Sequence, residues 1–225
     1  MPSKPEEAVE LRTVYGWTLP ASDRHFESYL AGTFEVAGRR VYQPDHITKS
    51  TSLCRRRRVA LDAGAHVGMW SYYLAAMFEQ VHAFEPSALL RACFLRNVRL
   101  PNVTLHEIAL GRQAGRAELR LVPDNTGATH IAAADAGSVE VRRLDDYAFP
   151  VVDFLKVDVE GFELFVFEGA RETLLRCKPV VIFEQKGFAE RFGRGETAAA
   201  DYLRSLGAVQ LDTVKKDLIY GWRRR

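Results

Sequence analysis

The sequence predicts an α/β fold built on an open, mostly parallel sheet. From Val59 onward, short runs of β-branched and aromatic residues alternate with helical segments, which is the pattern of strand–helix units that form a parallel sheet. A glycine-spaced turn, GAHVG, follows the first of these strands at 64–68. Acidic residues also stand at or near the carboxyl ends of the predicted strands. In an open parallel sheet these ends meet at one edge, where ligands bind.

The predicted elements of the sheet follow one another in a regular order. Core strands are expected at 58–64, 80–86, 102–110, 153–161 and 179–186. Helices are expected between them at about 67–78, 87–97 and 162–176, with another near 195–206. The last two runs, 207–214 and 217–223, are separated only by Lys215 and Lys216, so we expect an antiparallel hairpin that completes the sheet.

Residues 1–55 lie outside this regular pattern. They are weakly periodic, and their clearest helical stretch is 17–30, which Ser22 or Asp23 could cap. We therefore expect a partly helical extension on the substrate side over 1–55 and the main domain over 56–225.

An insertion separates the third and fourth core strands. The runs AELRLV and VEVRRL are predicted as extra strands, and they flank a Gly/Ala-rich loop at 123–138. Two interpretations of this loop remain open. Asn125, Thr126 and Gly127 either cover an acceptor molecule or belong to an ordinary mobile loop.

Composition and charge exclude several classes of protein. The 31 basic residues nearly match the 29 acidic ones, so the net charge of +2 gives little reason to expect a nucleic-acid surface. Cys54, Cys93 and Cys177 are scattered and odd in number, which favours reduced thiols over a disulfide framework or metal knuckle. No apolar run approaches the roughly 18 residues of a membrane span, and the N-terminus has no apolar signal core. We expect a cytoplasmic protein.

A short basic run, CRRRR, occupies 54–58 directly before the first core strand. It has no interleaved aromatic residues, so a solvated entry to the sheet is the favoured interpretation. The alternative is a contact with a phosphate-bearing acceptor, such as a nucleotide-sugar or a carrier-bound substrate.

The residues around the glycine turn select among its possible ligands. No Gly-Lys-Ser/Thr follows, which excludes a P-loop, and a side chain occupies the middle of the turn, unlike the dinucleotide pattern. Asp62 before the turn would repel a pyrophosphate but suits the cationic S-adenosylmethionine. Glu85 follows 23 residues later and can accept both ribose hydroxyls. A turn without a ligand is the alternative for Gly64 and Gly68.

Four stretches of the sequence resemble a known family. VALDAGAHVGMWSYYLA, VHAFEPSALLRACFLRNV, VRRLDDYAFPVVDFLKVDVEGFELFVFEGA and KPVVIFE are similar to FkbM-type S-adenosylmethionine-dependent methyltransferases, in the family's order, over about 59–186. The most specific part is the DVEG element with its flanking residues, Lys156, Asp158, Glu160, Gly161 and Glu163. The resemblance implies a class I methyltransferase fold, Rossmann-like, in the main domain. It also implies methylation mostly of hydroxyl groups on sugars, polyketides and other natural products, with amide N-methylation as a minority activity.

The donor is expected to lie along the ends of the first three core strands. The predicted cofactor-binding residues are Asp62, Gly64, Ala65, His66, Gly68, Glu85, Pro86, Glu107 and Ala109. Glu107 and Ala109 end the third strand, where adenine is expected, and the backbone of Ala109 is the favoured contact. His66 stands where the family usually has Asn.

Catalysis is expected at the end of the fourth core strand. Asp158 and Glu160 would act as base or as ligands to an ion such as Mg²⁺, and Lys156 points to the same face of the strand. Glu184 ends the next strand and would join Asp158 as an oxygen ligand of that metal. His66 is the other candidate base.

The leading hypothesis is therefore an S-adenosylmethionine-dependent O-methyltransferase that acts on a small-molecule, glycan or carrier-bound acceptor. One alternative keeps the donor and methylates an amide nitrogen in a peptide. Another is a non-catalytic scaffold that retains only the fold.

Overall fold

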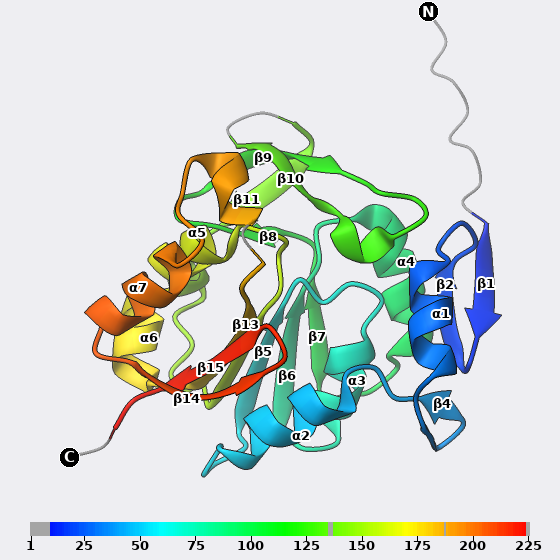
Figure 1. The fold of residues 1–225 in the computed structure, drawn as a ribbon, viewed down its shortest axis with the longest axis horizontal. Coiled ribbons are helices and arrows are strands. Elements are labelled where there is room, and N and C mark those ends of the chain that lie inside the picture. The colour runs from blue at the N-terminus through cyan, green and yellow to red at the C-terminus, as the bar shows by residue number, and fades with distance from the viewer. Residues whose placement is uncertain (1–9, 135–136, 187, 224–225) are drawn as a thin grey trace, which may run out of the picture.

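A seven-stranded sheet forms the centre of the molecule in a computed structural model that describes residues 10–134, 137–186 and 188–223. Its strand order is β14-β15-β13-β12-β5-β6-β7 (Figure 1). The bounds are β5 (Val59–Ala63), β6 (Gln80–Phe84), β7 (Val103–His106), β12 (Phe154–Val157), β13 (Val180–Glu184), β14 (Val209–Val214) and β15 (Asp217–Gly221). The strands from β13 to β7 pair in parallel, while β15 pairs antiparallel with β13 and with β14. The mostly parallel sheet and its C-terminal hairpin are as predicted.

Helices cover both faces of this sheet (Figure 1). One face carries α2 (Pro44–Ser52), α3 (Met69–Ala75) and α4 (Ala88–Asn97), and the other carries α5 (Glu163–Glu168), α6 (Arg171–Cys177) and α7 (Ala198–Ser205). Successive residues of a strand point to opposite faces of the sheet and pack in the hydrophobic core on that face. In β12, Phe154 packs in the core with Trp70 of α3, whereas Leu155 and Val157 pack in the core with Leu164 of α5.

Two predicted elements of the core are each divided in the structure. The third strand ends at His106, and Ala109–Leu110 form β8, which pairs with the insertion. The helix predicted over 162–176 is interrupted between α5 and α6. A Cβ on Gly169 would lie 1.9 Å from the Gly111 carbonyl oxygen, so the chain approaches β8 too closely there for any side chain.

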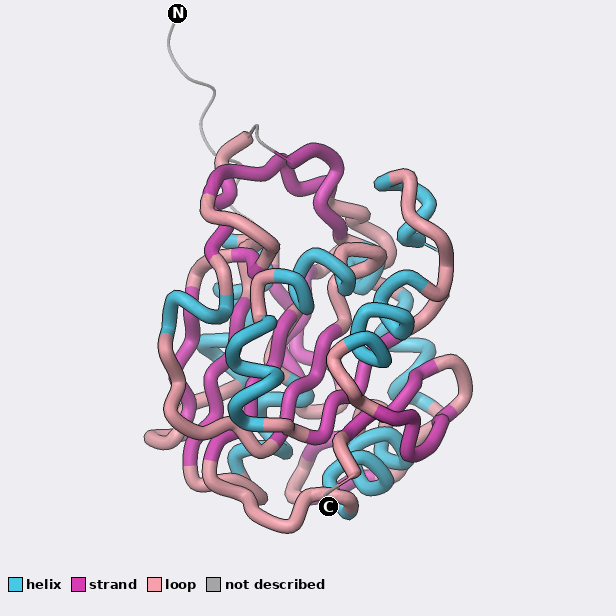
Figure 2. Tube along the Cα trace, turned by 90° about the vertical axis from the view of Figure 1, so that its left-hand side faces the viewer, coloured by secondary structure: helices cyan, strands magenta, loops and turns pink. Residues whose placement is uncertain are grey.

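The insertion forms a second sheet with the order β10-β9-β11-β8, and these strands are labelled in Figure 1. In Figure 2 strands lie at the top of the molecule, above the central sheet. The predicted extra strands are confirmed as β9 (Gly115–Arg120) and β11 (Val139–Arg142), which pair antiparallel. The prediction of a plain loop at 123–138 is wrong in part. It contains a 3-10 turn, η1 (Thr126–Ala128), and β10 (His130–Ala134), and Asp135 and Ala136 lie outside the described residues.

The N-terminal segment packs against α4 of the core. It contains the hairpin β1 (Leu11–Val14) and β2 (Trp17–Pro20), α1 (His25–Ala31), and the short pair β3 (Glu35–Val36) and β4 (Arg39–Arg40). The helix predicted over 17–30 is therefore wrong before His25, because Trp17 and Leu19 are completely buried strand residues. Arg24 is the N-cap residue of α1, and the Oδ1 of the preceding Asp23 accepts the Phe26 N–H of its first turn at 3.1 Å.

The basic run before β5 is anchored at its last residue. Arg58 forms an ion pair with Asp153, with the guanidinium 2.6 Å from Oδ1, while Arg55, Arg56 and Arg57 are exposed. This arrangement matches a solvated entry to the sheet. Within the part of the chain that the structure describes, no helix is long and apolar enough to cross a membrane.

Asn97 joins the N-terminal segment to the glycine turn. Its Oδ1 accepts the Thr18 N–H at 2.7 Å, and its Nδ2 donates to the carbonyls of Thr18 at 2.9 Å and Val67 at 2.8 Å. The side chain is 3% exposed, so these three backbone groups have little access to water.

Asn97→Ala should lower the free energy of unfolding by about 2–4 kcal/mol, because buried backbone groups lose their partners. Urea denaturation of the full chain measures this change. Arg96→Ala, at the exposed neighbouring position of α4, is the control and should cost less than about 0.5 kcal/mol. Equal stability of the two variants would show that Asn97 does not hold the segment in place.

Candidate functional site

A cavity of about 220 Å³ lies at the carboxyl ends of β5, β6, β12 and β13. Its inner wall is the glycine turn together with the ends of these strands. Its outer wall comes from two segments far apart in sequence: His25, Phe26 and Tyr42, and then Leu119 and Asn125–Ile131 of the insertion. The strand order reverses between β5 and β12, and open α/β sheets bind ligands at such a point.

The glycine turn depends on the absence of side chains at its two ends. Gly64 has φ +76°, and a Cβ there would lie 1.9 Å from the Asp158 carbonyl oxygen. Gly68 has φ +91°, and its Cβ would lie 2.5 Å from Val98 Cγ2. Gly64 and Ala65 line the cavity, whereas Gly68 lies behind them at the start of α3. The turn is thus pressed between β12 and α4.

Glu85 follows β6 and faces the turn from inside the cavity. It is 4% exposed, its Oε2 accepts the His66 N–H at 2.8 Å, and its Oε1 accepts the Ser87 N–H at 2.8 Å. Burial raises the pKa of Glu85 to about 7, against the effect of these hydrogen bonds. Each carboxylate oxygen keeps a lone pair for a further donor. Pro86 lines the cavity beside it.

Asp62 lies behind the turn and does not line the cavity. It is completely buried, its Oδ2 accepts the Ser71 hydroxyl at 2.7 Å, and its Oδ1 lies 3.1 Å from Lys156 Nζ. Lys156 Nζ also donates to the Gly64 carbonyl at 2.7 Å. Burial opposes the charge of Lys156, but Asp62 and Asp158 outweigh it, and the pKa of Lys156 is raised. Asp62 therefore acts on the cavity through Lys156, which does line it.

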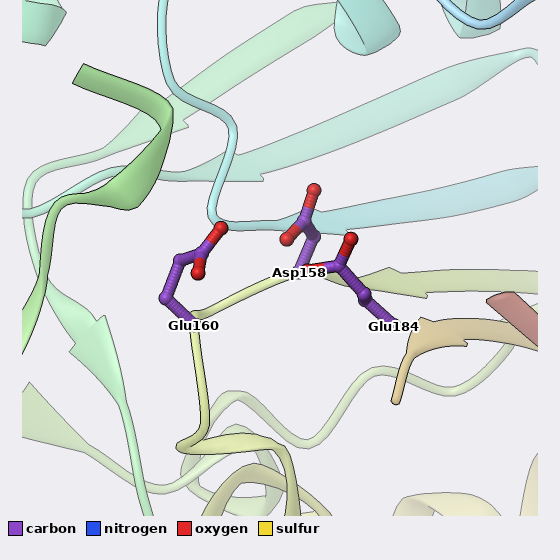
Figure 3. Close-up of side chains that lie close together, drawn as sticks. All are labelled: Asp158, Glu160 and Glu184. Carbon is purple, nitrogen blue, oxygen red and sulfur yellow. The ribbon is translucent and has the colours of Figure 1, made fainter. Parts of the chain in front are cut away.

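Three carboxylates meet on the far side of the cavity. Asp158, Glu160 and Glu184 bring one oxygen each to within 4.8 Å of one another (Figure 3). Glu160 is 9% exposed with φ +55°, and its pKa is raised to about 8 by burial and then by Asp158 and Glu184. Glu184 forms an ion pair with Lys186, and burial raises its pKa as well.

Glu163 supports the turn that presents Asp158 and Glu160. Its Oε1 accepts the Val159 N–H at 3.2 Å and the Gly161 N–H at 3.1 Å. Gly161 has φ +105°, and a Cβ there would lie 2.7 Å from the Phe188 carbonyl oxygen. The backbone around Glu160 is therefore held in one conformation on both sides.

The two residues predicted at the end of the third strand are separated. The Glu107 side chain is 67% exposed, pairs with Arg91 at 3.0 Å and lies outside the cavity. Ala109 lines the cavity together with Ile108 and Leu110. The chain turns into β8 at this point, which directs the Glu107 carboxylate away from the apolar wall.

Several cavity residues are missing from the sequence-based prediction: Phe26, Tyr42, Phe162, Lys186 and Phe188. Lys186 had a signal, because it alternates with Glu184 along the strand and so shares its face. Tyr42 had none, since it belongs to the weakly periodic N-terminal segment. Burial raises the pKa of Tyr42 well above its usual value, and Asp158 adds to this effect.

Comparison with known proteins identifies the family of this chain. A family model described as Methyltransferase FkbM domain matches residues 62–209. The chain belongs to the FkbM methyltransferase family. Methyltransferase 1 of Beauveria bassiana (strain ARSEF 2860) is 30% identical in an alignment 141 residues long, with coverage of 48% of this chain and 57% of that protein. Methyltransferase sdnD of Sordaria araneosa is 26% identical in an alignment 173 residues long, with coverage of 56% of this chain and 67% of the relative.

A solved structure of this family shares the fold. The methyltransferase FkbM of Methylobacillus flagellatus KT superimposes with a TM-score of 0.51 at 20% identity, covering 77% of this chain and 47% of that one. The predicted class I methyltransferase fold is confirmed, and the present chain spans about half the length of that relative. The region that matches the family begins at Asp62. The part of the outer wall that comes from residues 25–42 therefore lies outside the matched region.

Stability should fall as the pH rises from about 6.5 to about 8. The folded-state pKa of Glu160 is about 8 against an ordinary 4.5, so the folded chain keeps a proton that the unfolded chain has released. Glu85, Glu163 and Asp217, with pKa values of about 7, act in the same direction. The folded state then binds more protons, and the free energy of unfolding decreases with pH.

Calorimetric Tm values across this range measure the effect. The histidines whose pKa values are lowered by burial act in the opposite direction, but below their ordinary value of 6.5. Glu160→Gln should flatten the decline, whereas Glu118→Gln, an exposed control, should leave its slope unchanged. A Glu160→Gln slope as steep as that of the wild type would contradict the assignment.

Proposed function

We propose that this FkbM-family chain transfers a methyl group from S-adenosylmethionine to a hydroxyl group on a sugar, glycan or other natural product. When bound, the donor would supply an electrophilic methyl group on a cationic sulfur. The observation that carries the proposal is the arrangement of the cavity. Glu85 and the glycine turn occupy one side, and Asp158, Glu160 and Glu184 occupy the other, so one molecule on each side would bring two reactants together.

The residues on the donor side fit S-adenosylmethionine. Glu85 offers carboxylate oxygens for ribose hydroxyls, and Ile108, Ala109 and Leu110 offer an apolar wall for a flat adenine ring. Of the described residues that line the cavity, only Lys156 and Lys186 are cationic, and both are already paired with carboxylates. This lack of a free cation argues against a pyrophosphate ligand.

On the acceptor side, Asp158 is the best placed base. Its side chain is 30% exposed, which leaves room for an acceptor hydroxyl to reach it, and the proton released on methyl transfer would pass to its carboxylate. Glu160, with its pKa raised to about 8, holds a proton at neutral pH and would donate a hydrogen bond rather than accept the proton.

A divalent metal is the alternative for the same carboxylates. Asp158 and Glu184, with Glu160, would provide oxygen ligands only, which suits a hard cation such as Mg²⁺. An ion there would lower the pKa of an acceptor hydroxyl. The close pairing of Glu184 with Lys186 favours the metal-free arrangement, because the ammonium already neutralises one of the ligands.

The charge of the cavity favours a neutral acceptor. Among the described lining residues, Glu85, Asp158, Glu160 and Glu184 are acidic, and none of the lining residues is an arginine. A phosphate group close to the reacting hydroxyl would be repelled by Asp158 and would find no free cation, because Lys156 and Lys186 are already paired with carboxylates. Free sugars, glycans and polyketide hydroxyls therefore fit better than nucleotide-sugars whose phosphate enters the cavity.

A methyl-transfer screen with labelled donor tests this function. We expect label in neutral hydroxyl acceptors, and less in their phosphorylated counterparts. Label in peptide amides with none in hydroxyl compounds would replace the proposal by amide N-methylation. Failure of saturating S-adenosylhomocysteine to raise Tm would instead favour a non-catalytic scaffold.

Two variants should distinguish the role of the donor side of the cavity from that of the acceptor side. Asp158→Asn should lower kcat by at least about 100-fold and leave the Kd for S-adenosylhomocysteine within about threefold, because it removes a base that the donor does not need. Glu85→Ala should raise that Kd by about tenfold or more through loss of the ribose partner. Calorimetric titration and initial rates measure both effects.

The metal alternative makes a different prediction for the same protein. Treatment with EDTA should leave the wild-type rate unchanged if Asp158 acts as a base. A rate that disappears with EDTA and returns with Mg²⁺ would assign Asp158 and Glu184 to an ion. Unchanged turnover of Asp158→Asn would remove Asp158 from catalysis altogether.

A further inference from the structure

Asp23, Thr126 and His66 form a buried chain of hydrogen bonds at the edge of the cavity. The Thr126 hydroxyl contacts Asp23 Oδ2 on one side and lies 2.8 Å from His66 Nε2 on the other. Asp23 and Thr126 are 0% and 1% exposed. The three residues come from the N-terminal segment, the insertion and the glycine turn, so this chain joins both parts of the outer wall to the inner wall.

The direction of each hydrogen bond follows from the chemistry of the groups. Asp23 accepts the Phe26 N–H at 3.1 Å on Oδ1 and the Thr126 N–H at 2.9 Å on Oδ2, which are contacts of an ionised carboxylate. An ionised carboxylate can only accept, so the single hydroxyl hydrogen of Thr126 is donated to Asp23. The Thr126 oxygen is then left as an acceptor, and His66 Nε2 must carry the hydrogen that fills it.

The surroundings of His66 keep its ring neutral. The ring stacks on Phe26 with centroids 4.8 Å apart and planes at 28°. Burial lowers the pKa of His66 to about 4, and the nearby Asp23 carboxylate opposes this only in part. A neutral imidazole with hydrogen on Nε2 has a free lone pair on Nδ1.

Nδ1 is the polar atom of His66 that remains available to a ligand. His66 lines the cavity, and the Thr126 hydroxyl already occupies its Nε2.

We propose that Asp23 and Thr126 are positioning residues that fix His66 with hydrogen on Nε2, so that Nδ1 accepts a hydrogen bond from a hydroxyl or ammonium group of a ligand in the cavity. The identity of that ligand rests on the proposed function, since both the donor and an alcohol acceptor carry such groups. The protonation of His66 rests only on the residues around it. The same contacts hold η1 against the glycine turn. The position of the outer wall and the tautomer of His66 therefore depend on the same hydrogen bonds.

NMR of the ligand-free full chain tests the protonation of His66 directly. Long-range ¹H–¹⁵N spectra distinguish the two neutral tautomers and the imidazolium, and His66→Gln assigns His66 among the six histidines. We expect hydrogen on Nε2 at neutral pH in the wild type and in Thr126→Ser, which keeps the hydroxyl. Thr126→Val, which has nearly the same shape without the oxygen, should relax to a mixture of tautomers.

Hydrogen on Nδ1, or an imidazolium at neutral pH, in the wild type would overturn the proposal without the need for any variant. A Thr126→Val spectrum identical to that of the wild type would overturn it as well.

Binding and rate measurements on the same variants identify the ligand. If Nδ1 meets the donor, Thr126→Val should raise the Kd for S-adenosylhomocysteine by about tenfold, and Thr126→Ser should restore it. If Nδ1 meets the acceptor, Thr126→Val should raise the acceptor KM and leave the Kd for S-adenosylhomocysteine unchanged. Unchanged Kd and KM in Thr126→Val would refute the role toward ligands. A wild-type chain that ignores S-adenosylhomocysteine would count against the methyltransferase function, while the NMR result on His66 would still stand.

Discussion

The Lys156 ammonium connects the two sides of the cavity. It donates to the Gly64 carbonyl at 2.7 Å, lies 3.1 Å from Asp62 and 3.9 Å from Asp158, and is 5% exposed. The carbonyl that it binds belongs to the glycine turn, and Asp158 belongs to the carboxylate cluster. Because a buried charge is costly to leave unpaired, the position of each side depends on the other through this one group.

The ion pair of Lys156 with Asp62 also changes the interpretation of the acidic residues at the strand ends. Asp62 looks like a free negative charge at the lip of the turn when the sequence is considered alone, but Lys156 neutralises it in the folded chain. The proposed preference for a cationic donor therefore depends on Glu85, which lines the cavity. Burial also lets Glu160 keep a proton at neutral pH, which limits the repulsion between Glu160 and the neighbouring Asp158 and Glu184.

The sequence contains enough information for the sheet and for its inner wall. Strand–helix alternation gave the strands from β5 to β13, and the family motifs gave Glu85, Asp158 and Glu184, because these positions are tied to strand ends. The break at Gly169 was not predictable, since it follows from contact with Gly111, which is distant in the sequence. The outer wall was not predictable for a similar reason. Nothing in the local pattern of Trp17–Pro20 distinguishes a buried strand from the start of a helix, and Tyr42 is brought to the cavity by tertiary packing.

The shared hydrogen bonds of Asp23 and Thr126 carry a consequence for redesign of this chain. The N-terminal segment and the insertion are separated by about a hundred residues, yet Ser22 also donates to the Pro123 carbonyl and the Arg24 N–H to the Asp124 carbonyl. In a chimera that receives only one of these segments from a relative, that segment would have to form these hydrogen bonds with a segment of the other protein. Transplantation of the outer wall of the cavity therefore requires both segments together, as a single graft around an unchanged sheet.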